Sequence, residues 1–178
     1  MNVISKNFKH GENFVIGSFC IIEDDVVFGD NVTLGNFCIV RKNIVVGSNT
    51  VLMNNIELRP ETIIGEDCYI DSGVKSSGKC RIGNKVTLRY DTIIARGVVI
   101  KDGTYVCPRV MTNNLNSGQD EIGGAQIGEN CFIGTNAVLQ HGIKIGNGVI
   151  IGAMSFVNKN CDDFATYVGI PAKKINNS

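Results

Sequence analysis

The chain has 178 residues, which is the size of one domain. Its 17 Lys and Arg residues balance 17 Asp and Glu residues, so a formal net charge of +0 gives no basis for nonspecific binding to nucleic acid. No apolar run is long enough to cross a membrane, and the N-terminal sequence MNVISKNFKHGENF lacks the apolar core of a signal peptide. We therefore expect a soluble, cytoplasmic protein that has neither nucleic acid nor membrane as a partner.

We expect a single domain over residues 1–178, in which residues 1–15 form an N-terminal lead-in. His10 and Gly11 can start an imperfect coil there, with His10 facing inward or capping the open end. Repeat proteins need atypical ends of this kind because a regular end would expose the core.

A six-residue repeat runs without a slip through residues 16–111. Its fifth position is small, β-branched or a thiol, and its second position is most often Gly. Its first position is large and apolar except at Ser76: Ile16, Ile22, Phe28, Leu34, Val40, Val46, Leu52, Leu58, Ile64, Ile70, Ser76, Ile82, Leu88, Ile94, Ile100 and Val106. A unit this short buries nothing alone and must stack, and a six-residue period is typical of a parallel β-helix.

The period also predicts which side chains face inward. Residues two apart in a strand share a face, so the fifth residue of one six and the first residue of the next point inward, with an outward residue between them. Positions two to four form a corner, where Gly, Asn and Asp permit a tight bend. Three sides and three corners make one coil, and the usual hand of this repeat class is left. The fold class is therefore an all-β, left-handed parallel β-helix of hexapeptide repeats.

The cysteines are predicted to fill the core rather than to bind metal or form disulfides. All but Cys107 fall at the inward fifth position, and Cys107 lies at a corner. Buried thiols behave as small apolar side chains. The odd total of seven and the lack of a CxxC pair also argue against a zinc cluster or a full disulfide framework, so we expect no metal site. The six inward thiols are Cys20, Cys38, Cys68, Cys80, Cys131 and Cys161.

Outward positions form columns along the prism, and two of the three columns are too apolar for free faces. One column contains Val27, Val45, Ile63, Arg81 and Val99, and the other contains Ile21, Ile39, Glu57, Lys75, Ile93 and Met111. An apolar face on a three-sided prism favours a closed homo-oligomer, most simply a homotrimer.

Two local features of the repeat stand out. One corner is basic, with Arg41, Lys42, Arg59 and Arg96, and it either holds a phosphate or is a solvated corner paired with nearby acids. The segment Ser76-Ser77-Gly78 interrupts the apolar ladder, which predicts a local bulge.

The phase breaks at residues 112–126, whose sequence TNNLNSGQDEIGGAQ is polar and rich in Gly. This stretch must leave the prism as a protruding loop, and a long loop in a regular repeat is commonly functional. The alternative is a tolerated insertion. The sixes resume over residues 127–162, and residues 163–178 form a C-terminal tail in which Pro171 fits an extended exit that closes the last coil.

The stretches IGENCFIGTNAVLQHGIKIG, IGNGVIIGAMSFV and YVGIPAKKI resemble the C-terminal part of the hexapeptide-repeat acyltransferases. In that family a similar loop and tail accompany acyl-coenzyme A bound in a groove between neighbouring subunits. The resemblance implies that Gly134, Gly152 and Ala153 line the pantetheine arm. It also implies that the tail residues meet the nucleotide end: these are Pro171, Lys173 and Lys174.

The stretch VCPRVMTNN, just before the loop, resembles N-acetyltransferases that act on amino-sugar nucleotides for bacterial surface polysaccharides, including lipopolysaccharide. The resemblance implies that Asn113 lies near the acceptor amine, with Asn114 beside it. Arg109, at the preceding corner, is a candidate contact for a sugar-nucleotide phosphate. Sugar O-acetyltransferases of the same fold carry a catalytic His near this point, and this chain has none there.

The chemistry of the acceptor favours N-acylation. A hydroxyl needs a base as it attacks a thioester, whereas a neutral amine needs chiefly to be positioned. Asn113 can orient the amine or the thioester carbonyl without titrating. His141, at a corner after the loop, is the one candidate base, since a neutral His with a pKa of about 6.5 can accept the ammonium proton. The alternative is a corner residue at a subunit seam.

Other classes of protein fit less well. A carbonic anhydrase of this fold needs three His ligands for zinc, and the chain has 2 His. An ice-binding prism needs a flat Thr array, which the outward columns lack, and a non-catalytic coenzyme A-binding module would show binding without turnover. We therefore predict a homotrimeric acetyl-CoA-dependent N-acetyltransferase with active sites between subunits and a nucleotide-linked amino sugar as acceptor. The alternative enzyme is a sugar O-acetyltransferase that uses His141 as base. The sequence does not identify the sugar, the amine position, the nucleotide base or the acyl chain length.

Overall fold

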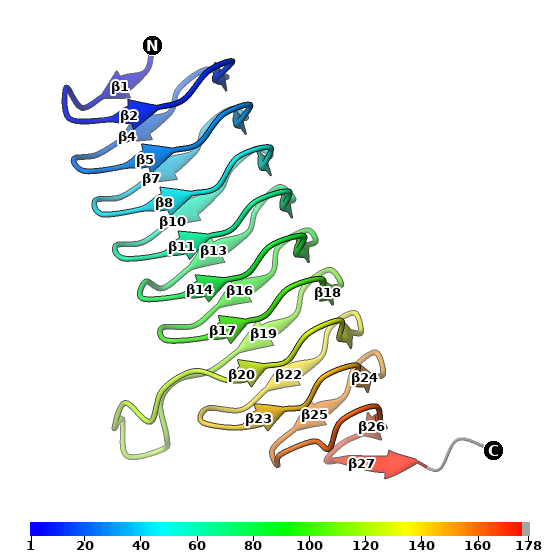
Figure 1. Ribbon diagram of the computed structural model, residues 1–178. Helices are drawn as coiled ribbons and strands as arrows, with labels where there is room; N and C mark the ends of the chain where they lie inside the picture. Colours follow the sequence, from blue (N-terminus) through cyan, green and yellow to red (C-terminus); the bar gives the residue numbers. More distant parts are fainter. Residues whose placement is uncertain (176–178) are drawn as a thin grey trace.

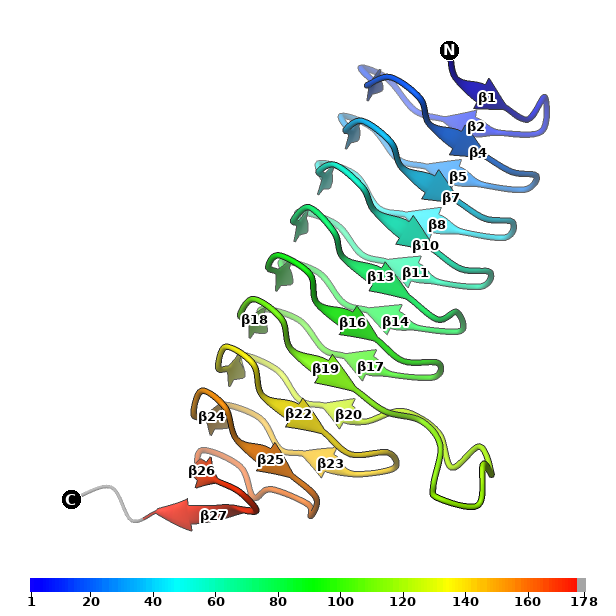
Figure 2. The same ribbon diagram turned by 180° about the vertical axis from the view of Figure 1, so that it is seen from behind.

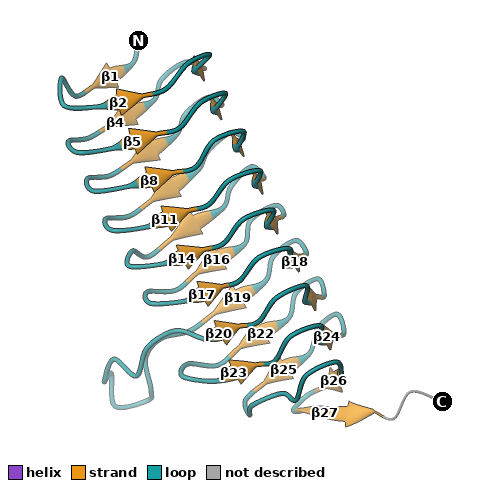
Figure 3. Cartoon of the chain, in the orientation of Figure 1, coloured by secondary structure: helices purple, strands orange, loops and turns teal. Residues whose placement is uncertain are grey.

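The computed structural model describes residues 1–175, which form a prism of short strands and turns without a helix in that range (Figure 3). None of the described segments could therefore cross a membrane as a helix. The chain winds left to right in front and right to left behind while it descends from the N-terminus (Figure 1). This is a left-handed coil, as the resemblance implied.

Three parallel sheets form the sides of the prism, and the chain visits them in turn. The first sheet contains β1 (Val3–Ile4), β4 (Ile21–Ile22), β7 (Ile39–Val40), β10 (Glu57–Leu58), β13 (Lys75–Ser76), β16 (Ile93–Ile94), β19 (Met111–Thr112), β22 (Val138–Leu139) and β25 (Phe156–Val157). The second contains β2 (Lys9–His10), β5 (Val27–Phe28), β8 (Val45–Val46), β11 (Ile63–Ile64), β14 (Arg81–Ile82), β17 (Val99–Ile100), β20 (Gln126–Ile127) and β23 (Lys144–Ile145).

The third sheet also includes the C-terminal hairpin. It contains β3 (Val15–Ile16), β6 (Thr33–Leu34), β9 (Val51–Leu52), β12 (Tyr69–Ile70), β15 (Thr87–Leu88), β18 (Tyr105–Val106), β21 (Phe132–Ile133), β24 (Ile150–Ile151), β26 (Thr166–Gly169) and β27 (Ala172–Ile175). All neighbouring strands pair in parallel except β26 and β27, which are antiparallel.

The corners stack into three edges of the prism. The first edge joins the first sheet to the second and includes residues 23–25, 41–43, 59–61, 77–79, 95–97, the loop, 140–142 and 158–160. The second edge joins the second sheet to the third and includes residues 11–13, 29–31, 47–49 and 65–67. The third edge joins the third sheet to the first and includes residues 71–73, 89–91, 107–109, 134–136 and 152–154.

The inward positions predicted from the repeat are confirmed. The first and fifth residues of the sixes form one continuous buried core, and all seven cysteines are buried free thiols, Cys107 among them. Burial raises the pKa of the Cys38 and Cys161 thiols to about 11. These thiols are therefore protonated, apolar fillers at neutral pH.

The corner residues show why Asn recurs in the repeat. Asn13, Asn31 and Asn49 adopt φ values of 54°, 56° and 59°, a left-handed conformation that Asn tolerates better than most residues. Their amides also join successive coils, with Asn13 donating to Asn31 over 2.9 Å and Asn31 donating to Asn49 over 2.9 Å. The ladder links residues 18 apart, so it repeats once per coil.

The regular stack begins before Ile16. Residues 1–15 pair as β1, β2 and β3 with the next coil, although they were expected to be a lead-in. Large rings occupy the inward fifth positions there, where Phe8 and Phe14 pack edge-on against Phe28 at the open end. His10 is exposed and lies 5.0 Å from the Phe14 ring, measured between ring centroids, so it belongs to this aromatic cap.

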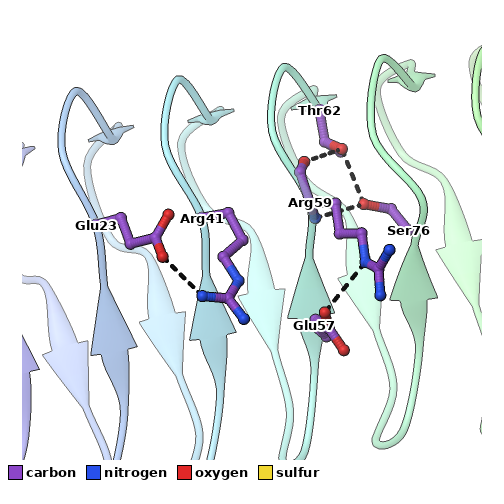
Figure 4. Close-up of polar contacts among 6 residues, drawn as sticks. All are labelled: Glu23, Arg41, Glu57, Arg59, Thr62 and Ser76. Atoms are coloured by element: carbon purple, nitrogen blue, oxygen red, sulfur yellow. Dashed lines mark hydrogen bonds and ion pairs between the residues drawn. The ribbon is translucent and has the colours of Figure 1, made fainter.

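The predicted bulge at Ser76 is wrong. Ser76 lies in β13, in register with β10 and β16, and its side chain is buried. Its Oγ accepts a hydrogen bond from the Arg59 backbone N–H over 3.1 Å and lies 2.8 Å from the Thr62 Oγ1 (Figure 4). The hydroxyl therefore has partners inside the core, and the ladder continues through it.

The C-terminal end departs from an extended exit. The last coil is shorter, since Asn160 caps Lys144 only 16 residues away instead of 18. The chain then turns back at Pro171, and β27 pairs with β26 at the end of the third sheet. The loop and this hairpin mark the same C-terminal half of the prism, as both views show (Figures 1 and 2).

Candidate functional site

The protruding loop leaves the first edge between β19 and β20 and occupies residues 113–125. Thr112 and Gln126, the two ends of the predicted loop, belong to the flanking strands. The loop closes on itself as a small hairpin, in which the N–H groups of Ile122 and Gly123 donate to the Asn114 carbonyl over 2.9 and 3.2 Å. These hydrogen bonds within the loop therefore give it a defined conformation.

Hydrogen bonds fix the base of the loop to the coils on either side. On the N-terminal side, the buried Thr112 hydroxyl accepts from the Ala95 N–H over 2.6 Å and donates to the Ile93 carbonyl over 3.1 Å. On the C-terminal side, the Asn113 N–H donates to Leu139, and the Gly142 N–H donates to Gly123, each over 3.0 Å. The structure thus holds Asn113 directly against the coil that carries His141.

His141 lies on the first edge, one coil below the loop base, and is half-buried. Its Nε2 lies 3.3 Å from the Gln140 amide nitrogen. Its Nδ1 is buried and has no hydrogen-bond partner among residues 1–175. A buried polar nitrogen without a partner is costly, so this atom is the position where a bound molecule or a second copy of the chain would gain a hydrogen bond.

The remaining predicted residues fall into two other places. Arg109, Gly134, Gly152 and Ala153 lie on the third edge, at the opposite end of the first-sheet strands from Asn113 and His141. Asn113 follows Arg109 by four positions of extended chain, which span about 13 Å. The structure therefore brings Asn113, Asn114 and His141 together and separates them from the third-edge residues within one chain.

Gly134 is explained by the stacking of coils. A Cβ atom built on it would lie 2.5 Å from the Ala153 backbone nitrogen and 2.7 Å from the Gly152 carbonyl carbon. The same clash with the next coil recurs at Gly17, Gly35 and Gly65. The glycine at 134 is thus required by the fold and is not itself a sign of a bound ligand.

A hollow of about 420 Å³ lies at the C-terminal end of the prism. It is lined by the tail residues Pro171, Lys173 and Lys174 and by Lys159 from the first edge. Lys174 pairs with Asp162 over 3.0 Å, and this ion pair lowers the pKa of Asp162 and raises the pKa of Lys174. Lys159 lies one coil below His141 on the same edge. A cluster of exposed lysines at this point is suited to phosphate groups, because Lys binds phosphate as a compact point charge.

The basic corner is largely neutralised at its N-terminal end. Arg41 pairs with Glu23 over 2.7 Å, and Arg59 with Glu57 over 3.2 Å (Figure 4). These contacts support the solvated-corner interpretation for Arg41. The terminal guanidinium nitrogens of Arg59 have no dashed contact in the same view.

Some residues of the site were missed by sequence reasoning. Thr112 was counted within the loop, although a Thr at a first position, where the repeat demands a large apolar side chain, is itself a signal. On the third edge, the fully buried Asp71 pairs with Arg89 over 3.0 Å, and Arg89 donates to the Tyr105 hydroxyl over 3.2 Å. Within residues 1–175 no group of three or more His, Cys, Asp or Glu side chains is arranged to hold a metal ion.

Known proteins share this fold and part of this sequence. Residues 124–159 match the family described as bacterial transferase hexapeptide (six repeats). A serine acetyltransferase from Buchnera aphidicola is 35% identical over 102 residues, covering 54% of this chain and 39% of the relative. A dTDP-4-amino-4,6-dideoxy-D-glucose acyltransferase from Escherichia coli is 32% identical over 118 residues, covering 60% of this chain and 57% of the relative.

Among solved structures, a UDP-N-acetylglucosamine acyltransferase from Bacteroides fragilis superposes with a TM-score of 0.75 at 18% identity, covering 98% of this chain and 72% of that chain. At this identity the likeness shows the fold alone. Repeat, fold and relatives together define a left-handed β-helix protein. The chain is a hexapeptide-repeat protein, and its resemblance to the hexapeptide-repeat acyltransferases is confirmed. The chain spans between 39% and 57% of the length of these two relatives.

Proposed function

We propose that the chain transfers an acetyl group from acetyl-CoA to the amine of a nucleotide-linked amino sugar of the kind used in surface polysaccharides. The main support is the position of His141. It is half-buried, its Nδ1 has no hydrogen-bond partner among the described residues, and it lies one coil from Asn113 at the base of an ordered loop. The similarity to an acyltransferase for a dTDP-linked amino sugar supports this class of acceptor.

Asn113 and His141 have different roles in the proposed reaction. Acetyl-CoA supplies the acetyl group as a thioester, and the acceptor nitrogen forms the new C–N bond as the C–S bond breaks. The Asn113 side-chain amide orients the amine or the thioester carbonyl, which supplies rate through positioning. His141 accepts the proton that the amine loses, because one imidazole nitrogen has no partner within the described chain. The thiolate that leaves takes up a proton, so the charges balance.

Coenzyme A would lie on the C-terminal side of His141. Lys159, Lys173 and Lys174 surround a hollow there that fits its phosphates. Gly152 and Ala153 would line the pantetheine from a neighbouring copy, since in one chain they lie on a different edge from His141. We therefore propose the homotrimer as the active form. We also propose that it is located in the cytoplasm.

An O-acetyltransferase is the second candidate, and His141 is the observation that favours it. A hydroxyl acceptor needs a general base, and His141 is the one imidazole near the loop. Both reactions use the same edge of the prism, so the acceptor decides between them.

The test measures thiol release from acetyl-CoA with a panel of nucleotide-linked amino sugars and with matched sugars that carry only hydroxyl groups. We expect turnover with an amino sugar, and a loss in kcat of about 100-fold or more in His141→Ala, the usual contribution of a general base. His10→Ala is the matched control because the chain has 2 His and His10 lies in the N-terminal cap. Turnover restricted to hydroxyl acceptors would replace the N-acyl proposal with the O-acyl one, and a His141→Ala enzyme of full activity would remove His141 as base.

A further inference from the structure

A second hollow lies on the first edge, on the opposite side of His141 from the lysine hollow. It has a volume of about 230 Å³ and is lined by Arg59, Lys79, Arg96 and Glu61, with Gly78 and Pro60 beneath. These residues come from three successive corners, so they form one continuous stripe along the edge. The lining carries three cations and one carboxylate, and Glu57 pairs with Arg59 beside it, so the stripe keeps a net positive charge.

The cations of this hollow are available to a ligand. Arg59 uses Nε for its contact with Glu57, which leaves the two terminal nitrogens of its guanidinium (Figure 4). Lys79 and Arg96 form no ion pair within residues 1–175, and both are exposed. Arg41, one coil before Arg59 on the same edge, is instead paired with Glu23. The stripe is therefore uncompensated at its C-terminal end, toward the loop.

The floor of the hollow is bare backbone. Gly78 is buried with φ +96°, and a Cβ atom there would lie 2.8 Å from the Pro60 carbonyl oxygen. At corners of the second edge the middle N–H donates to a side chain one coil below, as the Glu66 N–H donates to the Asn84 Oδ1 over 2.9 Å. Arg96 stands in that place here and offers no acceptor, so the Gly78 N–H has no partner among the described residues. A free backbone donor between cations is a feature that phosphate oxygens satisfy.

The axial spacing places this hollow at a defined distance from His141. Coils rise by about 4.8 Å, so Arg96 lies about 10 Å and Gly78 about 14 Å along the edge from His141. Asn113 and the loop base lie between them. One sugar ring with its attached phosphates would span this interval if its amine lay at His141 and its phosphates over Arg96 and Lys79.

From these observations we infer that the hollow formed by Arg59, Lys79 and Arg96 binds the phosphate groups of the acceptor, most naturally a diphosphate ester. This inference rests on the proposed function for the identity of the acceptor. Coenzyme A also carries a diphosphate, but the lysine hollow proposed for it lies on the C-terminal side of His141, three coils or about 14 Å along the edge from Arg96. The acceptor's phosphates are therefore assigned to the N-terminal side.

Direct binding of inorganic pyrophosphate to the full chain, measured by calorimetry, is the first test. We expect Arg96→Gln to raise the Kd about tenfold, the effect of losing one charge-assisted hydrogen bond, and Lys79→Gln to act in the same direction. Arg41→Gln is the matched control, since it removes the same charge from the same edge at a residue already paired. Melting temperatures of all variants confirm that they fold. Absence of pyrophosphate binding to the wild type, or equal weakening by Arg41→Gln, would overturn the inference.

Steady-state kinetics then separate the two sources of diphosphate. Arg96→Gln is expected to raise KM for the acceptor and to leave KM for acetyl-CoA unchanged. A rise in KM for acetyl-CoA alone would overturn the assignment to the acceptor. Selective loss of pyrophosphate binding in a chain that transfers no acetyl group would support the hollow while the proposed function fails, so the two failures are distinguishable.

Discussion

Thr112→Val tests whether the base of the loop is held by one hydroxyl. Val keeps the shape of Thr and removes both hydrogen bonds, the one from the Ala95 N–H at 2.6 Å and the one to the Ile93 carbonyl at 3.1 Å. The Ala95 N–H is left in a buried site without its acceptor, which costs about 1–3 kcal/mol. A chain of this size loses about 2–4 °C of melting temperature per kcal/mol, so a fall of roughly 4–8 °C is expected for about 2 kcal/mol.

The control for this experiment is Thr92→Val, at a buried Thr of the same core. Thr92 makes one side-chain hydrogen bond, to the Cys107 carbonyl over 3.2 Å, and leaves no backbone N–H without an acceptor. Its loss should cost about 1 kcal/mol, the usual net value of one hydrogen bond. Thermal melting followed by circular dichroism measures both variants. If Thr112→Val lowers the melting temperature no more than Thr92→Val, the hydroxyl does not support the loop base as argued.

Two further predictions follow from the stacking of the coils. Gly134→Ala should lower the free energy of unfolding by about 1–3 kcal/mol, because its Cβ would meet the backbone of the next coil at 2.5 Å. Gly118→Ala in the loop is the control: its Cβ meets only side-chain atoms at 3.2 Å or more, so the change should stay within about 0.5 kcal/mol. Equal melting temperatures of the two variants would contradict this account. The buried thiols of Cys38 and Cys161, whose pKa values burial raises from 9.0 to about 11, should react with a thiol reagent only as fast as the chain unfolds. Because the folded pKa is the higher one, their contribution to stability is complete below pH 9 and is lost as the pH rises toward 11, which melting curves at pH 8, 9, 10 and 11 would reveal.

The repeat predicts most of the fold because each position has one physical requirement. A side chain at the first or fifth position must fill the core, and this fixes the facing of every strand in the regular coils. The same rule fails where a residue satisfies the core in another way. Ser76 breaks the apolar pattern, yet its hydroxyl pairs with the Arg59 N–H and Thr62, so no bulge is needed. Phe8 and Phe14 break the small-residue pattern, yet their rings close the open end.

The candidate site was less accessible to sequence reasoning because it depends on contacts between coils. The period places His141 on an outward corner, but it does not show that Gly142 bonds to the loop residue Gly123 or that the His141 Nδ1 is buried without a partner. The hollow at Gly78 likewise depends on what the neighbouring coils lack, since Arg96 replaces a capping side chain. A missing hydrogen-bond partner of this kind can be seen only in the folded structure.

The two sets of predicted residues make the arrangement of copies part of the chemistry. Asn113 and His141 occupy the first edge, and Gly152 and Ala153 occupy the third edge, with the width of the first sheet between them. The paired strands keep these edges apart because each sheet is hydrogen-bonded through its full length. No motion of one chain joins them without breaking the prism. We propose that a second copy places its third edge against this first edge, and the exposed apolar side chains of Ile21 (37% exposed) and Met111 (41% exposed) on the first sheet give it a surface on which to pack. The proposed transferase activity therefore requires the oligomer, and a monomeric chain would bind acceptor phosphates at Arg96 without transferring the acetyl group.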